Sequence, residues 1–201
     1  MTAKEWREYY DASGDEPRAT LLDALERFDA EPGEGRLAVD LGCGAGRDTA
    51  ELLRRGWSVY AVDGEAEAIE RLRARIGEDE RLTTEVVRFE DVRLPPAHLV
   101  NSSFALAFCP PGAFPALWGR IAGALVAGGR FTGQLFGDRD GWAPLGASPS
   151  KSPMTFQTRE EVGELLKSFE VELLDEVEED GRTAVGDEKH WHVYHLVLRK
   201  R

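Results

Sequence analysis

The feature that most constrains the fold is the stretch LAVDLGCGAGRDT, residues 37–49, in which an apolar run leads directly into a glycine-rich loop. Its first five residues predict a buried strand, and the polar residues at its end begin a helical pattern. The glycines Gly42, Gly44 and Gly46 alternate with small residues. A loop of this kind lets the backbone approach a ligand closely, and the helix that follows directs its N–H groups toward that ligand. The stretch therefore predicts a strand–loop–helix unit with a binding site.

Strand and helix patterns alternate along the whole chain. The expected strands are 36–41, 57–63, 83–89, 102–108, 130–136, 170–177 and 190–200. The expected helices are 17–29, 47–56, 65–77, 114–125 and 158–169. Alternation predicts right-handed crossovers and a parallel sheet covered on both faces, whereas the last two strands are too close for a crossover and should pair antiparallel. The expected fold class is α/β: a Rossmann-like, seven-stranded, mostly parallel sheet with helices on both faces and a C-terminal antiparallel hairpin.

The length of 201 residues suits one domain with one core. Within a single domain over 1–201 we expect four parts. These are an N-terminal helical cap over 1–30, a cofactor-binding core over 36–136, a loop over 137–157, and a helix with the hairpin over 158–201. The stretch 137–154 is the longest irregular segment and predicts either a lid or a mobile connection.

Composition narrows the classes of partner. The net charge is −12, which disfavours a nucleic-acid partner because phosphate backbones repel an acidic surface. No apolar run reaches membrane-spanning length, and the polar N-terminus lacks the apolar core of a signal peptide, so we expect no membrane partner and a cytoplasmic location. Cys43 and Cys109 form no CxxC pair, so no metal site is expected.

Two classes of cofactor compete for the glycine loop. A dinucleotide requires the spacing GxGxxG, whose glycines let the backbone approach a pyrophosphate. Here the spacing is GxGxG, and Arg47 occupies the position of the third glycine. Asp40, two residues before Gly42, would face a pyrophosphate badly but would suit a positively charged group. S-adenosylmethionine carries a sulfonium and an ammonium and has no phosphate, so it matches the loop better.

The motifs around the loop resemble those of the class I S-adenosylmethionine-dependent methyltransferases. VDLGCGAG at 39–46 is similar to the first motif of that family. Further similar motifs follow in order as VYAVDGE at 59–65, RFEDVRLP at 88–95 and FALAFCPP at 104–111. The aromatic N-terminal stretch EWREYY is similar to the small bacterial members of the tellurite-resistance and thiopurine type. The resemblance covers roughly residues 5–136 and implies S-adenosylmethionine as the cofactor.

The resemblance also implies which side chains hold the cofactor. Around the motifs these are Asp40, Gly42, Cys43, Gly44, Gly46, Asp63, Gly64, Glu65, Asp91, Val92, Phe108 and Cys109. Asp63 would accept hydrogen bonds from both ribose hydroxyls, as a two-oxygen acceptor can. Asp91 would accept from the adenine amine, with the Val92 N–H on a ring nitrogen, although Glu90 could take the place of Asp91. Packing alone would also explain Cys43.

The N-terminal helix supplies further candidates. By the same resemblance, Trp6, Tyr9 and Tyr10 would shield the sulfonium by cation–π attraction or by excluding water. Arg18 would pair with the carboxylate of the cofactor. An amphipathic helix that packs its aromatic residues on the domain explains each of these side chains about equally well.

The acceptor side is less defined. The motif FCPPGAF lacks the polar first residue and the aromatic residue with which amino methyltransferases bind a target amine, which further disfavours nucleic acid. Asp140 follows a strand near the expected substrate mouth, and His190 and His192 share one face of the last strand while His195 lies on the other. Asp140 and His192 are the catalytic candidates, and structural histidines are the alternative.

The sequence therefore predicts methyl transfer from S-adenosylmethionine to a small molecule, either a thiol, a chalcogen oxyanion, or a metabolite oxygen or nitrogen. A non-catalytic protein that binds S-adenosylmethionine or S-adenosylhomocysteine is the alternative, because the same cofactor residues would serve it. A nicotinamide oxidoreductase is a weaker rival, since the GxGxG spacing and Asp40 disfavour it. The oligomeric state is left open.

Overall fold

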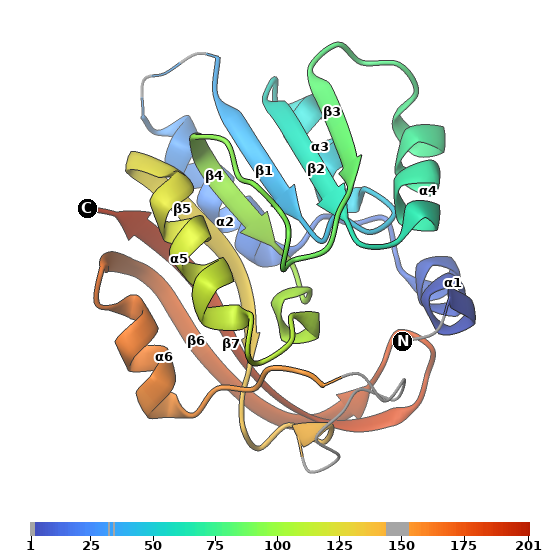
Figure 1. The fold of residues 1–201 in the computed structure, drawn as a ribbon, viewed down its shortest axis with the longest axis vertical. Helices are drawn as coiled ribbons and strands as arrows, with labels where there is room; N and C mark the ends of the chain where they lie inside the picture. The colour runs from blue at the N-terminus through green and yellow to red at the C-terminus, as the bar shows by residue number, and fades with distance from the viewer. Residues whose placement is uncertain (1–2, 32, 34, 144–152) are drawn as a thin grey trace.

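The computed structural model describes residues 3–31, 33, 35–143 and 153–201. Within this part the chain forms one seven-stranded sheet with the order β3-β2-β1-β4-β5-β7-β6 (Figure 1). The strands are β1 Leu37–Leu41, β2 Ser58–Asp63, β3 Leu82–Val86, β4 Ala97–Ser102, β5 Leu125–Phe136, β6 Phe169–Arg182 and β7 Glu188–Lys200. β1 to β5 pair in parallel, and β7 pairs antiparallel with both β5 and β6. The expected α/β sheet with its C-terminal hairpin at one edge is confirmed.

Six α-helices and one short 3-10 helix accompany these strands in the described residues. They are α1 Ala3–Ala12, α2 Ala19–Asp29, α3 Arg47–Arg54, α4 Ala66–Ile76, η1 Leu106–Phe108, α5 Phe114–Ala124 and α6 Arg159–Leu166. A capping box forms at the start of α6, where the Thr158 hydroxyl accepts from the Glu161 N–H and the Glu161 carboxylate accepts from the Thr158 N–H. Each of these helices is too short to cross a bilayer.

Alternating side chains of the strands build a core on each face of the sheet. Val39 and Leu41 of β1 pack with apolar residues of α5 and α6, whereas Ala38 packs with α2, α3 and α4. This division follows from the two-residue period of a strand. Figure 1 shows α5 and α6 in front of the sheet and α2 behind it, so both faces are covered.

The fourth strand is the point at which the sequence prediction fails. The apolar stretch 102–108 was expected to be a strand, but β4 lies at Ala97–Ser102, and Leu106–Phe108 forms η1. The polar residues Asn101 and Ser102 are fully buried in the strand, because Asn101 donates to Asp40 and Ser102 donates to the Leu41 carbonyl. After Ser103 the chain leaves the sheet at Phe104, whose φ is 54°. Hydrogen bonding rather than hydropathy places this strand.

The carboxyl ends of the parallel strands and the tip of the hairpin face the same region. In Figure 1 the arrowheads of β1 and β2 point toward α1, and the far end of the β6–β7 hairpin reaches the same side. Residues 144–152 of the expected loop over 137–157 lie outside the described residues, so the prediction of a lid or a mobile connection stays a prediction. The division of 1–201 into cap, core, loop and hairpin remains a prediction.

Candidate active site

A cavity of about 1120 Å³ lies at the carboxyl ends of the strands. Its lining comes from the loops after β1 to β4, the end of β5, the helix α1 and the hairpin β6–β7. Two parts of this lining differ in chemistry. The cofactor half comprises the lining from α1 and from the segments after β1, β2 and β3. The acceptor half comprises the lining from Phe104, from the end of β5 with Trp142, and from the hairpin.

The glycine loop after β1 forms the floor of the cofactor half. Gly42 has a φ of 78°, and a Cβ on it would lie 2.4 Å from the Ala105 Cβ, so only glycine fits. Gly46 has a φ of 82°, and a Cβ on it would lie 2.7 Å from the Leu72 Cγ of α4. Gly46 does not line the cavity. The third glycine therefore serves the close packing of the loop on α4.

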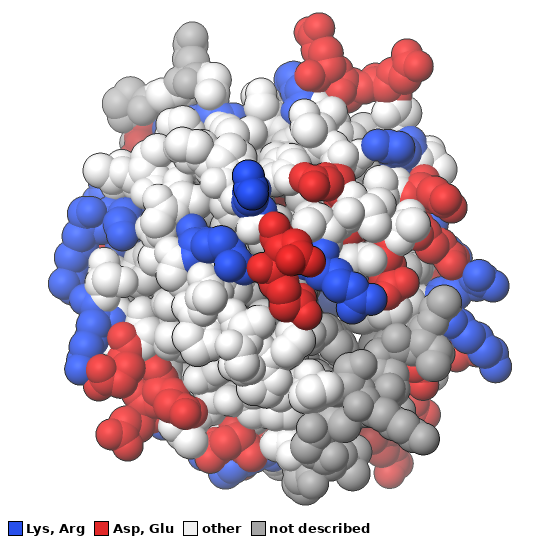
Figure 2. All heavy atoms as spheres, in the orientation of Figure 1, with Lys and Arg blue, Asp and Glu red and all other residues white. Residues whose placement is uncertain are grey.

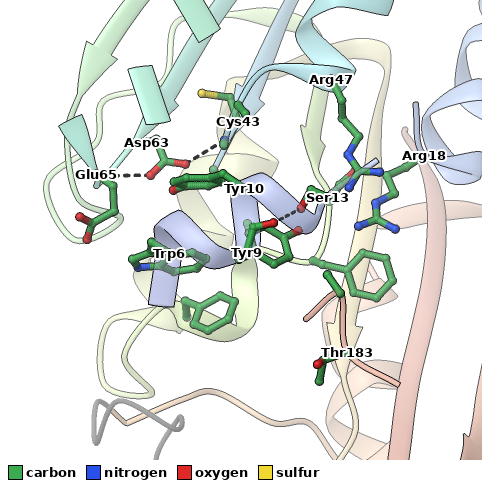
Figure 3. A pocket seen from close by; sticks show the side chains of 18 of the residues that line it. Trp6, Tyr9, Tyr10, Ser13, Arg18, Cys43, Arg47, Asp63, Glu65 and Thr183 are labelled. Atoms are coloured by element: carbon green, nitrogen blue, oxygen red, sulfur yellow. Dashed lines mark hydrogen bonds between the residues drawn. The ribbon is translucent and has the colours of Figure 1, made fainter. Parts of the chain in front are cut away.

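Asp63 stands at the end of β2 with its carboxylate held in place. One oxygen accepts from the Gly44 N–H and the other from the Glu65 N–H, each at 2.9 Å. Figure 3 shows these two bonds, with the Tyr10 ring beside the carboxylate. Burial raises the pKa of Asp63. Each oxygen keeps a second lone pair for a ligand, so the geometry fits a diol that donates to both oxygens.

Two buried carboxylates lie beside the loop. Asp40 accepts from Thr49 at 2.6 Å and from Asn101 at 2.9 Å, and Asp48 accepts from the same Asn101 amide at 3.0 Å. Both side chains are at most 3% exposed and line the cavity. Burial, with the Asp48 carboxylate adding to it, raises the pKa of Asp40 to about 7. Neither carboxylate forms an ion pair with the described residues. A cation in the cavity would therefore balance their negative charge.

Helix α1 covers the glycine loop with aromatic side chains. The Trp6 ring stacks on Tyr10 at 5.9 Å and meets Phe108 edge-on at 5.0 Å. Tyr10 is 7% exposed and would be 3.6 Å from a Cβ on Gly44. Ion pairs to α4 hold this arrangement, among them Arg7 with Glu67 at 3.1 Å. The expected shielding helix is therefore in position over the cavity (Figure 3).

Arg18 lies at the boundary of the two halves. Its backbone N–H donates to Asp48 at 2.9 Å, while its guanidinium carbon lies 4.6 Å from the centre of the Phe104 ring. No hydrogen bond or ion pair of that guanidinium is formed with the described residues. The cation is thus directed into the cavity and is available to an anionic group of a ligand.

Most of the expected cofactor residues line the cavity together. These are Trp6, Tyr10, Arg18, Asp40, Gly42, Cys43, Gly44, Asp63, Gly64, Glu65 and Phe108. Asp91, Val92 and Cys109 do not line it. Asp91 is exposed, and Val92 and Cys109 are buried in the core under α5. Glu90, the alternative to Asp91, does line the cavity.

The two catalytic candidates lie outside the cavity lining. Asp140 is fully buried and pairs with the ammonium of Lys189. His192 is also fully buried; its Nδ1 accepts from the Arg139 N–H at 3.1 Å and its Nε2 lies 3.0 Å from a Glu176 oxygen. Both ring nitrogens are thus engaged on the face of β7 that points away from the cavity. His195, on the other face, lines it.

Sequence reasoning missed the acceptor half almost entirely. Phe104, Trp191 and His195 line it, together with Val185 at the tip of the hairpin. Thr183, at the same tip, is labelled in Figure 3. One signal was present in the sequence, because the expected strand 190–200 is longer than the expected strands before it. β6 and β7 have 14 and 13 residues, whereas β1 to β4 have five or six, so the hairpin must extend beyond the sheet. The segment between them was expected only to join the two antiparallel strands.

Comparison with known proteins agrees with this geometry. A family described as "Methyltransferase domain" matches residues 38–129, from β1 into β5. Residues 38–129, with the glycine loop and the ends of β1, β2 and β4, are therefore similar to a methyltransferase domain. The resemblance seen in its motifs is confirmed, and S-adenosylmethionine is the cofactor of this class.

Individual relatives of this methyltransferase domain cover different shares of it. A probable cobalt-precorrin-6B C(15)-methyltransferase (decarboxylating) from Methanothermobacter thermautotrophicus is 55% identical over 53 residues, which are 26% of this chain and 28% of the relative. The chain spans less than half the length of the curated relatives it matches.

Two solved structures resemble the whole fold. The 1,6-didemethyltoxoflavin-N1-methyltransferase of Burkholderia thailandensis is 25% identical, with a TM-score of 0.67 over 98% of this chain and 86% of that chain. TehB from Haemophilus influenzae is 15% identical, with a TM-score of 0.69 over 89% of this chain and 62% of that chain. The likeness to TehB is one of fold.

Proposed function

We propose that this protein transfers a methyl group from S-adenosylmethionine to a small-molecule acceptor. The observation that carries the proposal is the joining of two halves in one cavity. The cofactor half holds a fixed carboxylate at the end of β2 and two buried carboxylates without a counter-charge. The acceptor half opens from the same space, which a protein that only bound the cofactor would not need.

The described residues fit the parts of the cofactor. Asp63 would accept from the ribose hydroxyls, and Gly64, Glu65 and Glu90 would border the adenine. Arg18 would pair with the carboxylate of the methionine moiety. Asp40 and Asp48 would lie near its positively charged end, where their uncompensated charge attracts a cation.

S-adenosylmethionine, when bound, supplies a methyl group on a positively charged sulfur. The task of the protein is to align the acceptor with that group and to exclude water from the space between them. Trp6 and Tyr10 cover this space from α1, and Phe108 closes it from η1. No side chain has to act as a base when the acceptor arrives deprotonated or loses its proton to water.

A small-molecule acceptor is supported by the size of the cavity and by the structural relative from Burkholderia, which is described with bound 1,6-didemethyltoxoflavin and S-adenosylhomocysteine. Nucleic acid is not proposed as a partner. On the face seen in Figure 2, lysines and arginines are interspersed with acidic side chains, and the whole chain carries a charge of −12. A cytoplasmic location is part of the same proposal.

Isothermal titration with S-adenosylmethionine, S-adenosylhomocysteine and NADH tests the cofactor. We expect both adenosyl ligands to bind and NADH not to bind. Binding of NADH instead would overturn the proposal. Tight adenosyl binding without methyl transfer to any member of a panel of thiols, selenite, tellurite and hydroxylated metabolites would favour the non-catalytic alternative.

Asp63→Ala tests the ribose assignment. We expect binding of S-adenosylmethionine to weaken by about 1–3 kcal/mol, because the ribose hydroxyls would lose their acceptor. Asp23→Ala on α2 is the matched control, since this carboxylate pairs with Arg27 and does not line the cavity. Equal affinity of the Asp63 variant and the wild type would contradict the assignment.

A further inference from the structure

We propose that the methyl acceptor is an uncharged planar aromatic compound, held between the aromatic side chains of the acceptor half and oriented by a hydrogen bond from the His195 Nε2–H. The inference rests on the proposed function and names its substrate class. It excludes the small oxyanions and aliphatic thiols that the sequence left open.

Four aromatic rings form a continuous wall in the acceptor half. Phe104 meets both Phe136 and Trp191 edge-on with centroids 6.1 Å apart, and Phe136 stacks with Trp142, also at 6.1 Å. Trp142 and Trp191 are 6.1 Å apart. All four rings line the cavity. A wall of this kind offers faces and edges to a flat ring, and stacking of an aromatic ligand on an aromatic side chain is favourable.

A buried ion pair fixes the wall from behind. The Lys189 ammonium lies 3.6 Å from the centre of the Trp191 ring and 4.4 Å from that of Trp142. Asp140 neutralises this ammonium and also accepts from the Trp142 N–H of the backbone at 3.0 Å. Lys189 does not line the cavity. Its charge therefore holds the rings in position and is not offered to a ligand.

His195 adds one directed polar group to this apolar surface. The Phe104 N–H donates to the Gln134 Oε1 at 2.9 Å, so the other end of the amide is the donor. The Gln134 Nε2 lies 2.9 Å from the Thr20 hydroxyl and 3.4 Å from the His195 Nδ1. Because an amide NH₂ only donates, Nδ1 accepts and the proton of the neutral ring is on Nε2.

The position of His195 makes it a donor toward the cavity. Burial lowers its pKa, so the ring is neutral near pH 7. Among the described residues nothing forms a hydrogen bond with Nε2, and the side chain lines the cavity. A ligand with an oxygen or nitrogen lone pair would accept this N–H.

Backbone strain at Phe104 supports a functional role for the wall. Among the described non-glycine residues only Phe104 has a positive φ, 54°. Such a conformation is rare and strained for a bulky residue. The hydrogen bond to Gln134 holds it, which directs the ring to the junction with the cofactor half. The same glutamine thus positions both Phe104 and His195.

The charges of the acceptor half disfavour an anion. Glu179 and Asp187 line it from the hairpin, and Arg182 is the basic residue that the described hairpin contributes. Arg182 lies 4.0 Å from Glu188, which reduces its attraction for a ligand. The Arg18 guanidinium at the boundary with the cofactor half would pair with the carboxylate of the methionine moiety. A neutral ring therefore avoids the repulsion that an oxyanion would meet from the carboxylates of the hairpin.

The reaction balances without a further reactant. A lone pair on an oxygen or nitrogen of the ring compound forms a bond to the methyl carbon. The bond from that carbon to sulfur breaks, and its electron pair remains on sulfur, so S-adenosylhomocysteine is the second product. The hydroxyl proton of a phenol-like acceptor passes to water.

Direct binding separates this inference from the proposed function. The protein saturated with S-adenosylhomocysteine is titrated with 5-hydroxyquinoline, 1-naphthol and selenite in a calorimeter. The first two differ only in one ring nitrogen. We expect both to bind, 5-hydroxyquinoline at least about tenfold more tightly, which is the effect of one hydrogen bond of about 1.4 kcal/mol. Selenite should not bind.

Variants test the two parts separately. Trp191→Ala should weaken binding of both ring compounds at least about tenfold, and Trp191→Phe should retain most of it. His195→Phe should remove the preference for 5-hydroxyquinoline, and His195→Gln, which keeps an N–H donor, should restore part of it. His190→Gln, on the outer face of the same strand, should match the wild type.

The outcomes are distinct. Binding of S-adenosylhomocysteine together with selenite, and with neither ring compound, would overturn the aromatic acceptor but leave the proposed function standing. Failure of S-adenosylhomocysteine to bind would overturn the proposed function. An unchanged preference in His195→Phe would overturn the role of His195 as the donor.

Discussion

The two halves of the cavity are built in different ways. In the cofactor half, Gly42, Gly44 and Asp63 belong to short motifs at the ends of neighbouring parallel strands. In the acceptor half, Phe104 and Trp191 meet although they are 87 positions apart in the chain. The cofactor half is therefore a product of local backbone geometry, whereas the acceptor half depends on tertiary packing. The following changes should act on one half and spare the other.

Asp140→Ala should have the largest effect and should act on the acceptor half. It leaves the buried Lys189 ammonium without its partner, which costs about 3–5 kcal/mol of unfolding free energy. Urea unfolding measures this loss. Asp138→Ala, whose side chain is 44% exposed, is the control and should change stability by less than about 0.5 kcal/mol. Equal stability of both variants would show that the ion pair does not hold the wall.

Gly42→Ala should break the cofactor half. A left-handed φ costs an alanine about 1–2 kcal/mol, and the contact of its Cβ with Ala105 adds about 1–3 kcal/mol. We expect S-adenosylmethionine binding, measured by calorimetry, to be lost or weakened at least about tenfold. Gly119→Ala in α5, where a Cβ meets nothing within 4 Å, should bind normally. Normal binding by Gly42→Ala would contradict the loop geometry.

A change of pH should sharpen the comparison, because burial raises the pKa of Asp40 to about 7 in the cofactor half. In the unfolded chain this carboxyl loses its proton near a pKa of about 3.9, whereas in the folded protein it keeps the proton up to a pH of about 7. Its contribution to the free energy of unfolding is therefore fully present at low pH and is lost as pH rises through about 7. A bound cation favours the ionised carboxylate, so cofactor affinity should rise over the same range.

Calorimetric titration with S-adenosylmethionine between about pH 6 and pH 8 measures this dependence, because this range spans the raised pKa of Asp40. Asp40→Asn keeps the shape of the side chain and should lose the slope. The same slope in the variant would assign the titration to another group.

Added salt should have the smallest effect. α1 and the segment behind it are tied to α4 by exposed ion pairs, Arg71 with Asp11 at 2.7 Å and Arg75 with Asp15 at 2.5 Å. Such pairs are weak and are screened by ions. Raising salt from about 0.05 to about 0.5 M should weaken cofactor binding slightly in the wild type and less in Arg71→Ala. Identical salt dependence would show that these pairs do not hold the cap.

The part of the site that could be predicted is the part that local sequence determines. Gly42 and Asp63 line the cavity as predicted, because a strand end fixes where the next residues lie. Asp91 and Cys109 do not line the cavity as the resemblance implied, because the course of the segments that carry them depends on packing with α5. β4 was misplaced because Asn101 and Ser102 are polar yet buried, and their partners Asp40 and Leu41 are 61 residues away. Trp191 and Phe104 carry no mark of contact in the sequence.

One of the two edge strands of the sheet, β6, has a consequence for association between molecules. Seven of its 14 residues are acidic, namely Glu170, Glu172, Asp175, Glu176, Glu178, Glu179 and Asp180. An open edge offers unpaired backbone groups to any other strand. A second copy that extended the sheet there would bring the two acidic rows together, and like charges on neighbouring strands repel. The acidic residues of β6 thus disfavour pairing of this edge with a second copy.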